Sequence, residues 1–263
     1  MDLGLKNKVA LVTGASSGLG LAIARELSAE GCSVAMVARR KDELERQASA
    51  IGAQTHGRVF AFAADVGETD AAPRIVTEVE RVLGPIDILV ANAGGPPSTT
   101  FETTSDEQYL AALNLNLMAS IRLAHACVPG MRARKWGRVL FLTSMAAKMP
   151  IPGLILSNTA RSGLLGFAKT LANEVAKDNV LVNTVLPGHF DTARAIELAQ
   201  MNATRQQKSV EDILSARRAG IPLGRSGDPS EFAAMVTFLA SDRASFITGA
   251  AIQVDGGQIS SLV

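Results

Sequence analysis

The sequence predicts an α/β fold in which a parallel β-sheet lies between two layers of helices. Short apolar runs alternate with longer amphipathic segments, and a glycine-rich turn separates the first run from the first amphipathic segment. Strands buried on both faces are apolar at almost every position, whereas the covering helices are apolar on one side only. The alternation is therefore typical of repeated strand–helix–strand units.

Seven apolar runs have the length expected of strands, and segments with a 3.6-residue periodicity separate them. Each run contains valine, isoleucine, leucine or phenylalanine, whose side chains suit a buried sheet. The predicted strands cover residues 8–14, 33–39, 58–65, 86–94, 137–144, 180–188 and 250–257.

Two of the intervening segments carry signals of helix ends. In segment 18–31 apolar residues recur on one face, and Gly31 follows the last of them, where glycine is typical of a helix end. Segment 105–134 begins with Ser105, whose hydroxyl suits an amino-terminal cap, and Gln108 three residues later strengthens that pattern. Both segments are therefore predicted to be helices that cover the sheet.

One interval interrupts this alternation. Residues 189–220 follow the sixth predicted strand and are more polar than the segments around them. A long insertion after the carboxyl end of a strand is where an α/β protein places a substrate loop or lid. We expect a lid-like substrate loop at about 189–220, with one or two solvated surface helices as the alternative.

Length and composition favour one soluble domain covering residues 1–263. The chain is 47% hydrophobic and 19% charged, and its net charge of +1 would attract neither nucleic acid nor an anionic membrane. The amino terminus has no apolar run of the signal-peptide kind, and Cys32 and Cys127 lack metal-ligand spacing. We therefore expect reduced core thiols, no metal, no nucleic-acid or membrane partner, and a cytoplasmic location.

The turn TGASSGLG, residues 13–20, lies between the first predicted strand and the first predicted helix. Its glycines let main-chain N–H groups and the helix amino terminus approach a pyrophosphate, and the last glycine lets the helix pack closely on the strand. Three glycines alone are a weak signal, but this position between strand and helix makes them a strong one for a dinucleotide site. The residues predicted to contact the cofactor here are Gly14, Ser16, Ser17, Gly18, Leu19 and Gly20.

The end of the second predicted strand indicates which dinucleotide binds. NAD sites place an acidic residue there for the ribose 2′-hydroxyl, but this chain has Ala38 followed by Arg39 and Arg40. Guanidinium groups offer a 2′-phosphate charge-assisted hydrogen bonds. We therefore predict NADP(H), with Arg39 as the main phosphate contact and Arg40 as the second; a solvated basic helix start is the alternative.

With these motifs the chain resembles the short-chain dehydrogenases/reductases, and among them the NADP-type 3-oxoacyl-(acyl carrier protein) reductases. The resemblance covers nearly the whole chain and includes the motifs AADV (63–66), NAG (92–94), LNLMAS (115–120), LTS (142–144) and PGHFDT (187–192). It implies a Rossmann-type, doubly wound sheet of seven parallel strands with helices on both faces. It also implies an NAD(P)-dependent oxidoreductase of carbonyl and alcohol compounds that forms a homo-oligomer, commonly a tetramer or dimer.

The resemblance assigns roles to individual positions. Ser144 and Asn116 match the catalytic serine and asparagine of the family; a strand-end cap and a polar helix kink are the structural alternatives. The other matches would line the cofactor from its adenine to its nicotinamide, and they are Asp65, Val66, Asn92, Ala93, Gly94, Pro187, Gly188 and Thr192.

The chain departs from the family pattern where the catalytic tyrosine and lysine belong. In the family the tyrosine follows the serine by thirteen residues and the lysine follows four residues later, and from Ser144 these intervals lead to Ser157 and Arg161. A serine hydroxyl is a much weaker acid than a tyrosine, and arginine stays protonated. Helical spacing places both side chains on one face, so Arg161 can still bind the nicotinamide ribose and polarise an oxygen, but the proton donor is missing.

His189 is the predicted substitute acid, because it follows Pro187 and Gly188 beside the nicotinamide and imidazole titrates near neutral pH. Lys148 is a weaker candidate, and a surface or packing role is the alternative for the histidine. Tyr109, the only tyrosine, is interpreted as a packing residue.

Three functions are compatible with these residues. The first is an NADP(H)-dependent oxidoreductase that transfers hydride between nicotinamide and a small carbonyl or alcohol substrate, with a non-standard proton donor. The second is a catalytically impaired NADP(H)-binding protein, a sensor or structural subunit. A halohydrin dehalogenase-like reaction is disfavoured, because those enzymes keep the tyrosine and lack the glycine-rich turn. The paired change to serine and arginine favours the first.

Overall fold

The computed structural model describes residues 1–262 and contains one sheet of seven parallel strands in the order β3-β2-β1-β4-β5-β6-β7. This is the order of a doubly wound sheet, so the predicted fold class is confirmed. Each strand lies within one apolar run of the sequence: β1 (Val9–Thr13), β2 (Ser33–Ala38), β3 (Val59–Ala63), β4 (Ile88–Ala91), β5 (Gly137–Leu142), β6 (Val180–Pro187) and β7 (Ala251–Val254).

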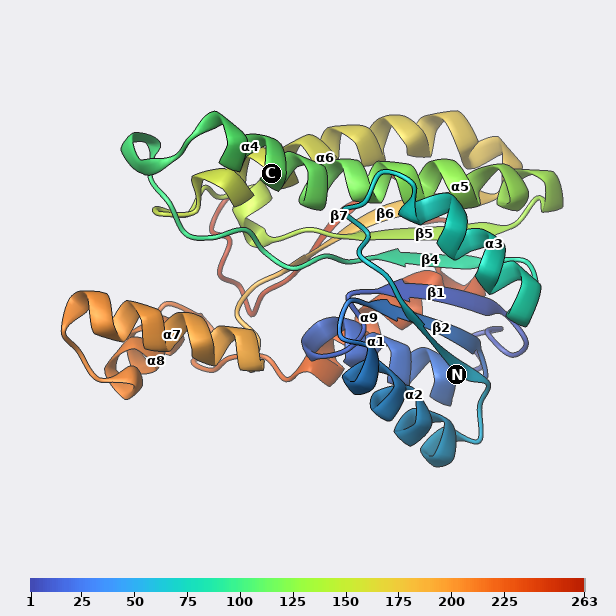
Figure 1. Ribbon diagram of the computed structural model, residues 1–263, viewed down its shortest axis with the longest axis horizontal. Coiled ribbons are helices and arrows are strands. Elements are labelled where there is room, and N and C mark those ends of the chain that lie inside the picture. The colour runs from blue at the N-terminus through green and yellow to red at the C-terminus, as the bar shows by residue number, and fades with distance from the viewer. Residues whose placement is uncertain (263) are drawn as a thin grey trace.

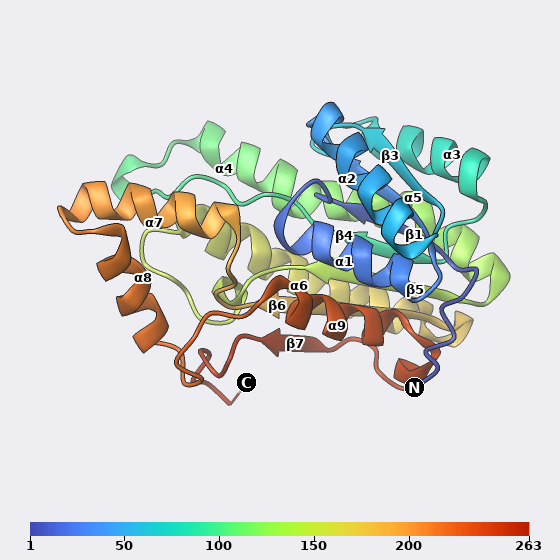
Figure 2. The ribbon, with the colours of Figure 1, turned by 90° about the horizontal axis from the view of Figure 1, so that it is seen from below.

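Helices cover both faces of the sheet (Figure 1 and Figure 2). Each layer forms its own hydrophobic core, because successive strand side chains point to opposite faces. Leu11 and Phe141 belong to one core, and Val12 and Leu140 to the other. The first core contains α3 (Ala71–Leu83), α5 (Ala119–Arg134) and α6 (Ile155–Val175), and the second contains α1 (Gly18–Ala29), α2 (Lys41–Thr55) and α9 (Pro229–Ala240).

A continuous helical stretch joins α4 (Asp106–Leu113) to α5 through a π-helical turn, Asn114–Met118. It begins at Ser105 as predicted, because Ser105 and Gln108 cap each other's main-chain N–H groups. The stretch is long and apolar enough to cross a membrane by length and composition, a test that core helices of soluble proteins also pass. Its contacts with α3, α6, β4 and β5 place it in the core of the fold.

The interval after β6 forms a helical hairpin rather than an irregular loop. α7 (Ala193–Gln206) and α8 (Val210–Ala219) pack on each other and project from one end of the sheet, at the left of Figure 1. Thr192 and Ser209 cap the two helices by accepting hydrogen bonds from main-chain N–H groups. The two-helix alternative therefore describes the local structure correctly, while the role of a lid stays a prediction.

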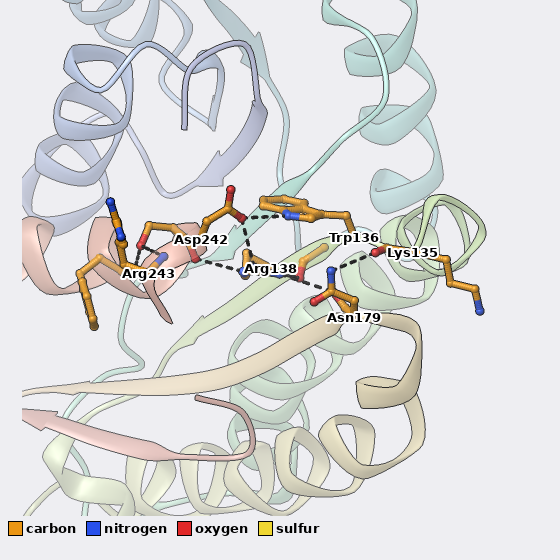
Figure 3. A network of polar contacts seen from close by, with 9 residues as sticks. Lys135, Trp136, Arg138, Asn179, Asp242 and Arg243 are labelled. Carbon is orange, nitrogen blue, oxygen red and sulfur yellow. Dashed lines mark hydrogen bonds and ion pairs between the residues drawn. The ribbon is translucent and has the colours of Figure 1, made fainter. Parts of the chain in front are cut away.

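At the amino edge of the sheet, Arg138 of β5 is fully buried within a network of polar contacts (Figure 3). Its guanidinium lies 4.4 Å from the ring of Trp136 and 3.5 Å from the carboxylate of Asp242. It also donates hydrogen bonds to three main-chain oxygens, those of Gly137, Asn179 and Ser241. This network ties β5 to the segments before β6 and after α9.

Cys32 and Cys127 are both buried and unpaired. Burial raises the pKa of each thiol to about 12, so neither is a thiolate near neutral pH. The interpretation as core thiols is therefore confirmed.

Candidate active site

The glycine-rich turn lies where the strand order of the sheet reverses, beside the carboxyl ends of β1 and β4. Gly14 and Gly18 have positive φ values of 61° and 58°, which favour glycine. A Cβ on Gly20 would lie 2.3 Å from the carbonyl oxygen of Gly14, so the turn and α1 approach too closely for any side chain. This geometry is that of a phosphate cradle at a helix amino terminus.

Asn92 connects the end of β4 to the same turn. Its main-chain N–H donates to Oγ1 of Thr13 at 2.9 Å, and the Thr13 hydroxyl donates back to the Asn92 carbonyl at 2.7 Å. The side-chain Nδ2 of Asn92 donates to the carbonyl of Gly14 at 3.4 Å. Beyond it, a Cβ on Gly94 would meet no atom within 4 Å, so the chain borders open space there.

The two arginines that follow β2 have different surroundings. Nη2 of Arg40 donates to the hydroxyls of Ser16 and Ser17, at 3.1 and 3.0 Å, and therefore lies on the glycine-rich turn. The Arg39 side chain is 74% exposed and lies 3.9 Å from the carboxylate of Asp65, which follows β3. The structure thus places the Arg40 guanidinium on the turn and the Arg39 guanidinium beside the acidic residue that follows β3.

The junction between β6 and α7 approaches the turn from the other side. Pro187 ends β6, and Gly188 lies so close to the chain after β7 that a Cβ would be 2.7 Å from the Cα of Asp255. Thr192 accepts a hydrogen bond from the main-chain N–H that caps α7, and its Cγ2 lies 3.5 Å from where a Cβ on Gly18 would be. Thr192, one of the residues predicted to bind the nicotinamide, therefore lies beside the glycine-rich turn.

Ser144 and Asn116 occupy the end of β5 and the π-helical turn. The Ser144 hydroxyl oxygen accepts a hydrogen bond from the N–H of Ala146 at 3.1 Å, which leaves its own hydrogen available. Nδ2 of Asn116 donates to the carbonyl of Gly94 at 2.7 Å, while its buried Oδ1 has no partner among the described residues. Asn116 thus connects the helix to the segment after β4, and its lone acceptor suits a ligand or water.

Ser157 and Arg161 lie one turn apart on α6, and both are buried. Nη1 of Arg161 donates to the carbonyl oxygens of Leu142 and Thr143, at 3.2 and 2.7 Å. Burial lowers the pKa of the guanidinium to about 10, so it remains positively charged at neutral pH. The structure therefore places a buried cation directly under the end of β5, beside Ser144.

His189 is held by Gln258, a residue near the carboxyl terminus. The His189 main-chain N–H donates to Oε1 of Gln258 at 3.0 Å, and Nε2 of Gln258 lies 2.7 Å from Nδ1 of the ring. Burial is the main cause that lowers the pKa of His189, which favours the neutral ring. Lys148, the weaker candidate acid, donates instead to the carbonyl of Ala251 in β7 at 3.3 Å.

Three further residues matter here, and none of them has a role predicted from the sequence. Thr13 and Gln258 hold predicted site residues in place, and Nη1 of Arg217 on α8 donates to the first turn of α7. Each is of a common residue type, and its partner is distant in sequence. Leu19, Val66 and Ala93, which were predicted to contact the cofactor, are partly buried. Residues 1–262 contain no cluster of His, Cys, Asp or Glu side chains able to hold a metal ion.

A family model described as enoyl-(acyl carrier protein) reductase matches residues 14–258. The protein belongs to the short-chain dehydrogenase/reductase family. The match includes the glycine-rich turn, the end of β5 and the chain after β7, so the predicted resemblance is confirmed at the level of the family.

Similar proteins are reductases. Acetoacetyl-CoA reductase of Shinella zoogloeoides is 37% identical over 254 residues, which cover 96% of this chain and 98% of the relative. The 3-oxoacyl-[acyl-carrier-protein] reductase MabA of Mycobacterium bovis is 34% identical over 94% of this chain and 91% of its own length. The crystal structure of L-sorbose reductase from Gluconobacter frateurii, complexed with NADPH and L-sorbose, matches with a TM-score of 0.95 and 36% identity over 100% of both chains. The predicted class of oxidoreductase is therefore confirmed.

Proposed function

We propose that this oxidoreductase transfers hydride between NADP(H) and a carbonyl or alcohol group of a small-molecule substrate, with a non-standard proton donor. The observation that carries the proposal is the glycine-rich turn with the Arg40 guanidinium held on its serines, next in the chain to the exposed guanidinium of Arg39. The cofactor is NADP(H), as in the sorbose reductase, whose structure contains NADPH.

The residues of the turn fit the phosphates of NADP(H). Gly14, Gly18 and Gly20 leave the amino end of α1 open to the pyrophosphate. Arg39 would be the main contact of the 2′-phosphate, because its exposed side chain has only one long ion pair to give up. Arg40 would be the second contact, and Ser16 and Ser17 already hold it beside the turn.

The remaining predicted residues would carry the cofactor along the carboxyl edge of the sheet. Asp65 and Val66 would lie by the adenine, and Asn92, Ala93 and Gly94 by the ribose. Thr192 would bind the carboxamide, between Pro187 and Gly188 on one side and the lid on the other. These assignments are supported by the contacts that bring Asn92 and Thr192 to the glycine-rich turn.

NADPH, when bound, supplies the hydride, and the chain has to orient and polarise the substrate carbonyl. The Ser144 and Ser157 hydroxyls would donate hydrogen bonds to the substrate oxygen, since Ser144 has its hydrogen available. Arg161 would bind the nicotinamide ribose and stabilise negative charge on that oxygen from a site where burial strengthens electrostatics. Asn116 would accept a hydrogen bond through its unpaired Oδ1.

The proton is proposed to come from His189. Gln258 accepts from the His189 main chain through Oε1, and both of its amide atoms lie near ring Nδ1, Oε1 at 2.9 Å and Nε2 at 2.7 Å, so Gln258 orients the ring. The proton would leave the imidazolium form and yield the neutral ring, and because burial lowers the pKa of His189, little imidazolium is present near neutral pH and slow turnover is expected. General acid–base catalysis contributes roughly 10²- to 10⁴-fold, and a poor donor loses part of that factor.

NADPH oxidation with a panel of ketones, quinones and β-ketoacyl thioesters tests the proposal. The Ser157→Tyr/Arg161→Lys double variant, which restores the family pair, is measured in parallel. Turnover by the parent protein supports the oxidoreductase. Turnover by the double variant alone, with unchanged NADPH affinity in both, would favour the alternative of a catalytically impaired NADP(H)-binding protein.

We also propose a cytoplasmic homo-oligomer, a tetramer or dimer. Large apolar side chains exposed at and near α4, Phe101 and Leu110, support an association surface there. Leu164, Ala168 and Val175 of α6, by contrast, are buried in the protein's own core and so are not available for pairing. Light scattering after size exclusion measures the assembly.

A further inference from the structure

A buried positive charge without an acidic partner lies at the carboxyl edge of the sheet. Arg161 is 8% exposed, and two main-chain carbonyls are its hydrogen-bond acceptors. Among residues 1–262, no Asp or Glu forms an ion pair with it, and none accepts from its Nε or Nη2. Burying a cation without a counter-ion is unfavourable, so the site is suited to an anion that arrives with a ligand.

The phosphates of the cofactor are too far away to be that anion. The pyrophosphate cradle follows β1 and the 2′-phosphate residues follow β2, whereas Arg161 lies under the end of β5. Neighbouring strands are about 4.8 Å apart, and β4 separates β1 from β5, which puts the cradle on the order of 10 Å away. The nicotinamide end of the cofactor carries no negative charge. The counter-ion must therefore belong to the substrate.

Within residues 1–262, a second arginine without an acidic partner lies in the α7–α8 hairpin. Nη1 of Arg217, on the last turn of α8, donates to the carbonyl of Ala195 at 3.3 Å. Its charge contributes, after burial, to the lowered pKa of His189, so it lies near the residue that follows β6. The neighbouring Arg218 differs, because it forms an ion pair with Glu211. β5 and β6 are adjacent strands, and Arg217 bonds to the first turn of α7, the helix that follows β6.

We propose that the substrate carries a carboxylate close to its reacting carbonyl, and that Arg161 binds this carboxylate with Arg217 as a second contact. This inference rests on the proposed function, since it names the substrate class of the same site. The planar N–H groups at Nε and Nη2 match the two oxygens of a carboxylate in a paired arrangement. A tyrosine ring in place of Ser157 would stand beside Arg161 on α6, so the smaller serine leaves more room there for the anion.

Calorimetry with the NADP⁺-saturated protein tests the proposal without turnover, because a ketone does not react with the oxidised cofactor. The probes are 2-oxopentanoate, 3-oxopentanoate and 4-oxopentanoate, each compared with its methyl ester. We expect at least one acid to bind about tenfold or more tightly than its ester, as a charged hydrogen bond can provide. Equal affinity of acid and ester in all three pairs, or no binding of any acid, overturns the proposal.

Single substitutions test which arginines cause the preference for the acid over its methyl ester. Arg161→Gln should abolish the acid-over-ester preference, and Arg217→Gln should reduce it. Arg218→Gln, the matched control on the lid, should leave it unchanged. Should Arg161→Gln not fold by circular dichroism, Arg161→Lys replaces it, and it should weaken the preference because a single ammonium cannot pair with both oxygens. A preference that survives in the folded Arg161 and Arg217 variants overturns the proposal.

NADPH titration of each variant separates this inference from the proposed function. A parent protein that binds NADPH but shows no acid preference loses the carboxylate inference and keeps the oxidoreductase. A parent protein that binds neither NADPH nor NADP⁺ loses the proposed function. Titration of the acids without cofactor then still measures whether Arg161 recognises a carboxylate.

Discussion

Two buried arginines stand at opposite ends of β5 and have opposite surroundings. Arg138, near its amino end, has an acidic partner in Asp242, a ring contact with Trp136 and three main-chain acceptors. Arg161, under its carboxyl end, has two main-chain acceptors and no acidic partner within residues 1–262. The first charge is compensated by the fold, whereas the second is left for a ligand to compensate.

The comparison distinguishes a buried arginine whose charge stabilises the fold from a buried arginine whose charge is available to bind a ligand. Compensation at the amino edge comes from loops that pack there permanently, as Figure 3 shows for Asp242 and Asn179. At the carboxyl edge the strands end toward the α7–α8 hairpin and the glycine-rich turn, where an α/β sheet binds its ligands. Substitutions at the first edge should therefore change mainly stability, and those at the second mainly binding.

The largest effect is expected from Arg138→Met. Removing the guanidinium deletes its hydrogen bonds to the carbonyls of Gly137 and Ser241 and its contacts with Asp242 and Trp136, and we expect the free energy of unfolding to fall by about 3 kcal/mol. Urea unfolding followed by the emission of Trp136, the only tryptophan, measures the change. A loss below about 1 kcal/mol would mean that the amino-edge network does not stabilise the fold as its contacts indicate.

Arg39→Ala and Arg40→Ala should weaken cofactor binding and leave stability nearly unchanged, the reverse of what we expect for Arg138→Met. We expect the affinity for NADPH to fall by about tenfold or more, most for Arg39→Ala, because charge-assisted phosphate contacts are lost. NADH affinity and the free energy of unfolding should stay nearly constant, since Arg39 is largely exposed. Arg46→Ala on α2 is the control, because Arg46 pairs with Glu43. Parallel losses for NADPH and NADH would contradict the phosphate role.

Arg161→Met should change stability by less than about 1 kcal/mol, in contrast to Arg138→Met. The variant loses two hydrogen bonds to carbonyls but no longer buries an uncompensated charge, and these effects oppose each other. Parallel urea unfolding of both methionine variants measures the difference. Equal losses in the two variants would remove the distinction between a compensated and an uncompensated arginine.

The smallest effect concerns pH. Because burial lowers the pKa of His189 in the folded protein, the unfolded chain binds more protons below about pH 6.5. The free energy of unfolding should therefore fall as pH decreases through that range, and less so in His189→Gln. Urea unfolding of both proteins between pH 7 and pH 5 measures the slopes. Identical slopes would indicate that the folded and unfolded states protonate His189 alike.

Much of the architecture could be predicted from local patterns. Ser105 and Gln108 begin a helix as expected, and every predicted strand contains one observed strand. The interval 189–220 was expected as a loop, yet its caps at Thr192 and Ser209 produce two helices. Capping residues act over a few positions and were present in the sequence, but the polar composition of the interval obscured them.

The candidate site was predicted in outline and not in its contacts. The glycines and the two arginines after β2 belong to short motifs, so their neighbourhood followed from chain order. The partners of these residues could not be predicted, because the contacts join residues far apart in sequence. Arg40 bonds to Ser16 and Ser17, and His189 bonds to Gln258. The sequence motifs likewise gave Arg217 no role, because nothing adjacent to it indicates where its guanidinium lies.

The sequence by itself determined the sheet and the glycine-rich turn after β1, since each depends on neighbouring residues, and it predicts Ser157 and Arg161 at the positions of the family tyrosine and lysine. The tertiary structure alone decided which buried arginine is neutralised. Arg138 takes an acceptor 103 positions away at Ser241, whereas no Asp or Glu side chain of residues 1–262 pairs with Arg161. Counter-charges act through space, and a pattern of neighbours along the chain carries no information about them.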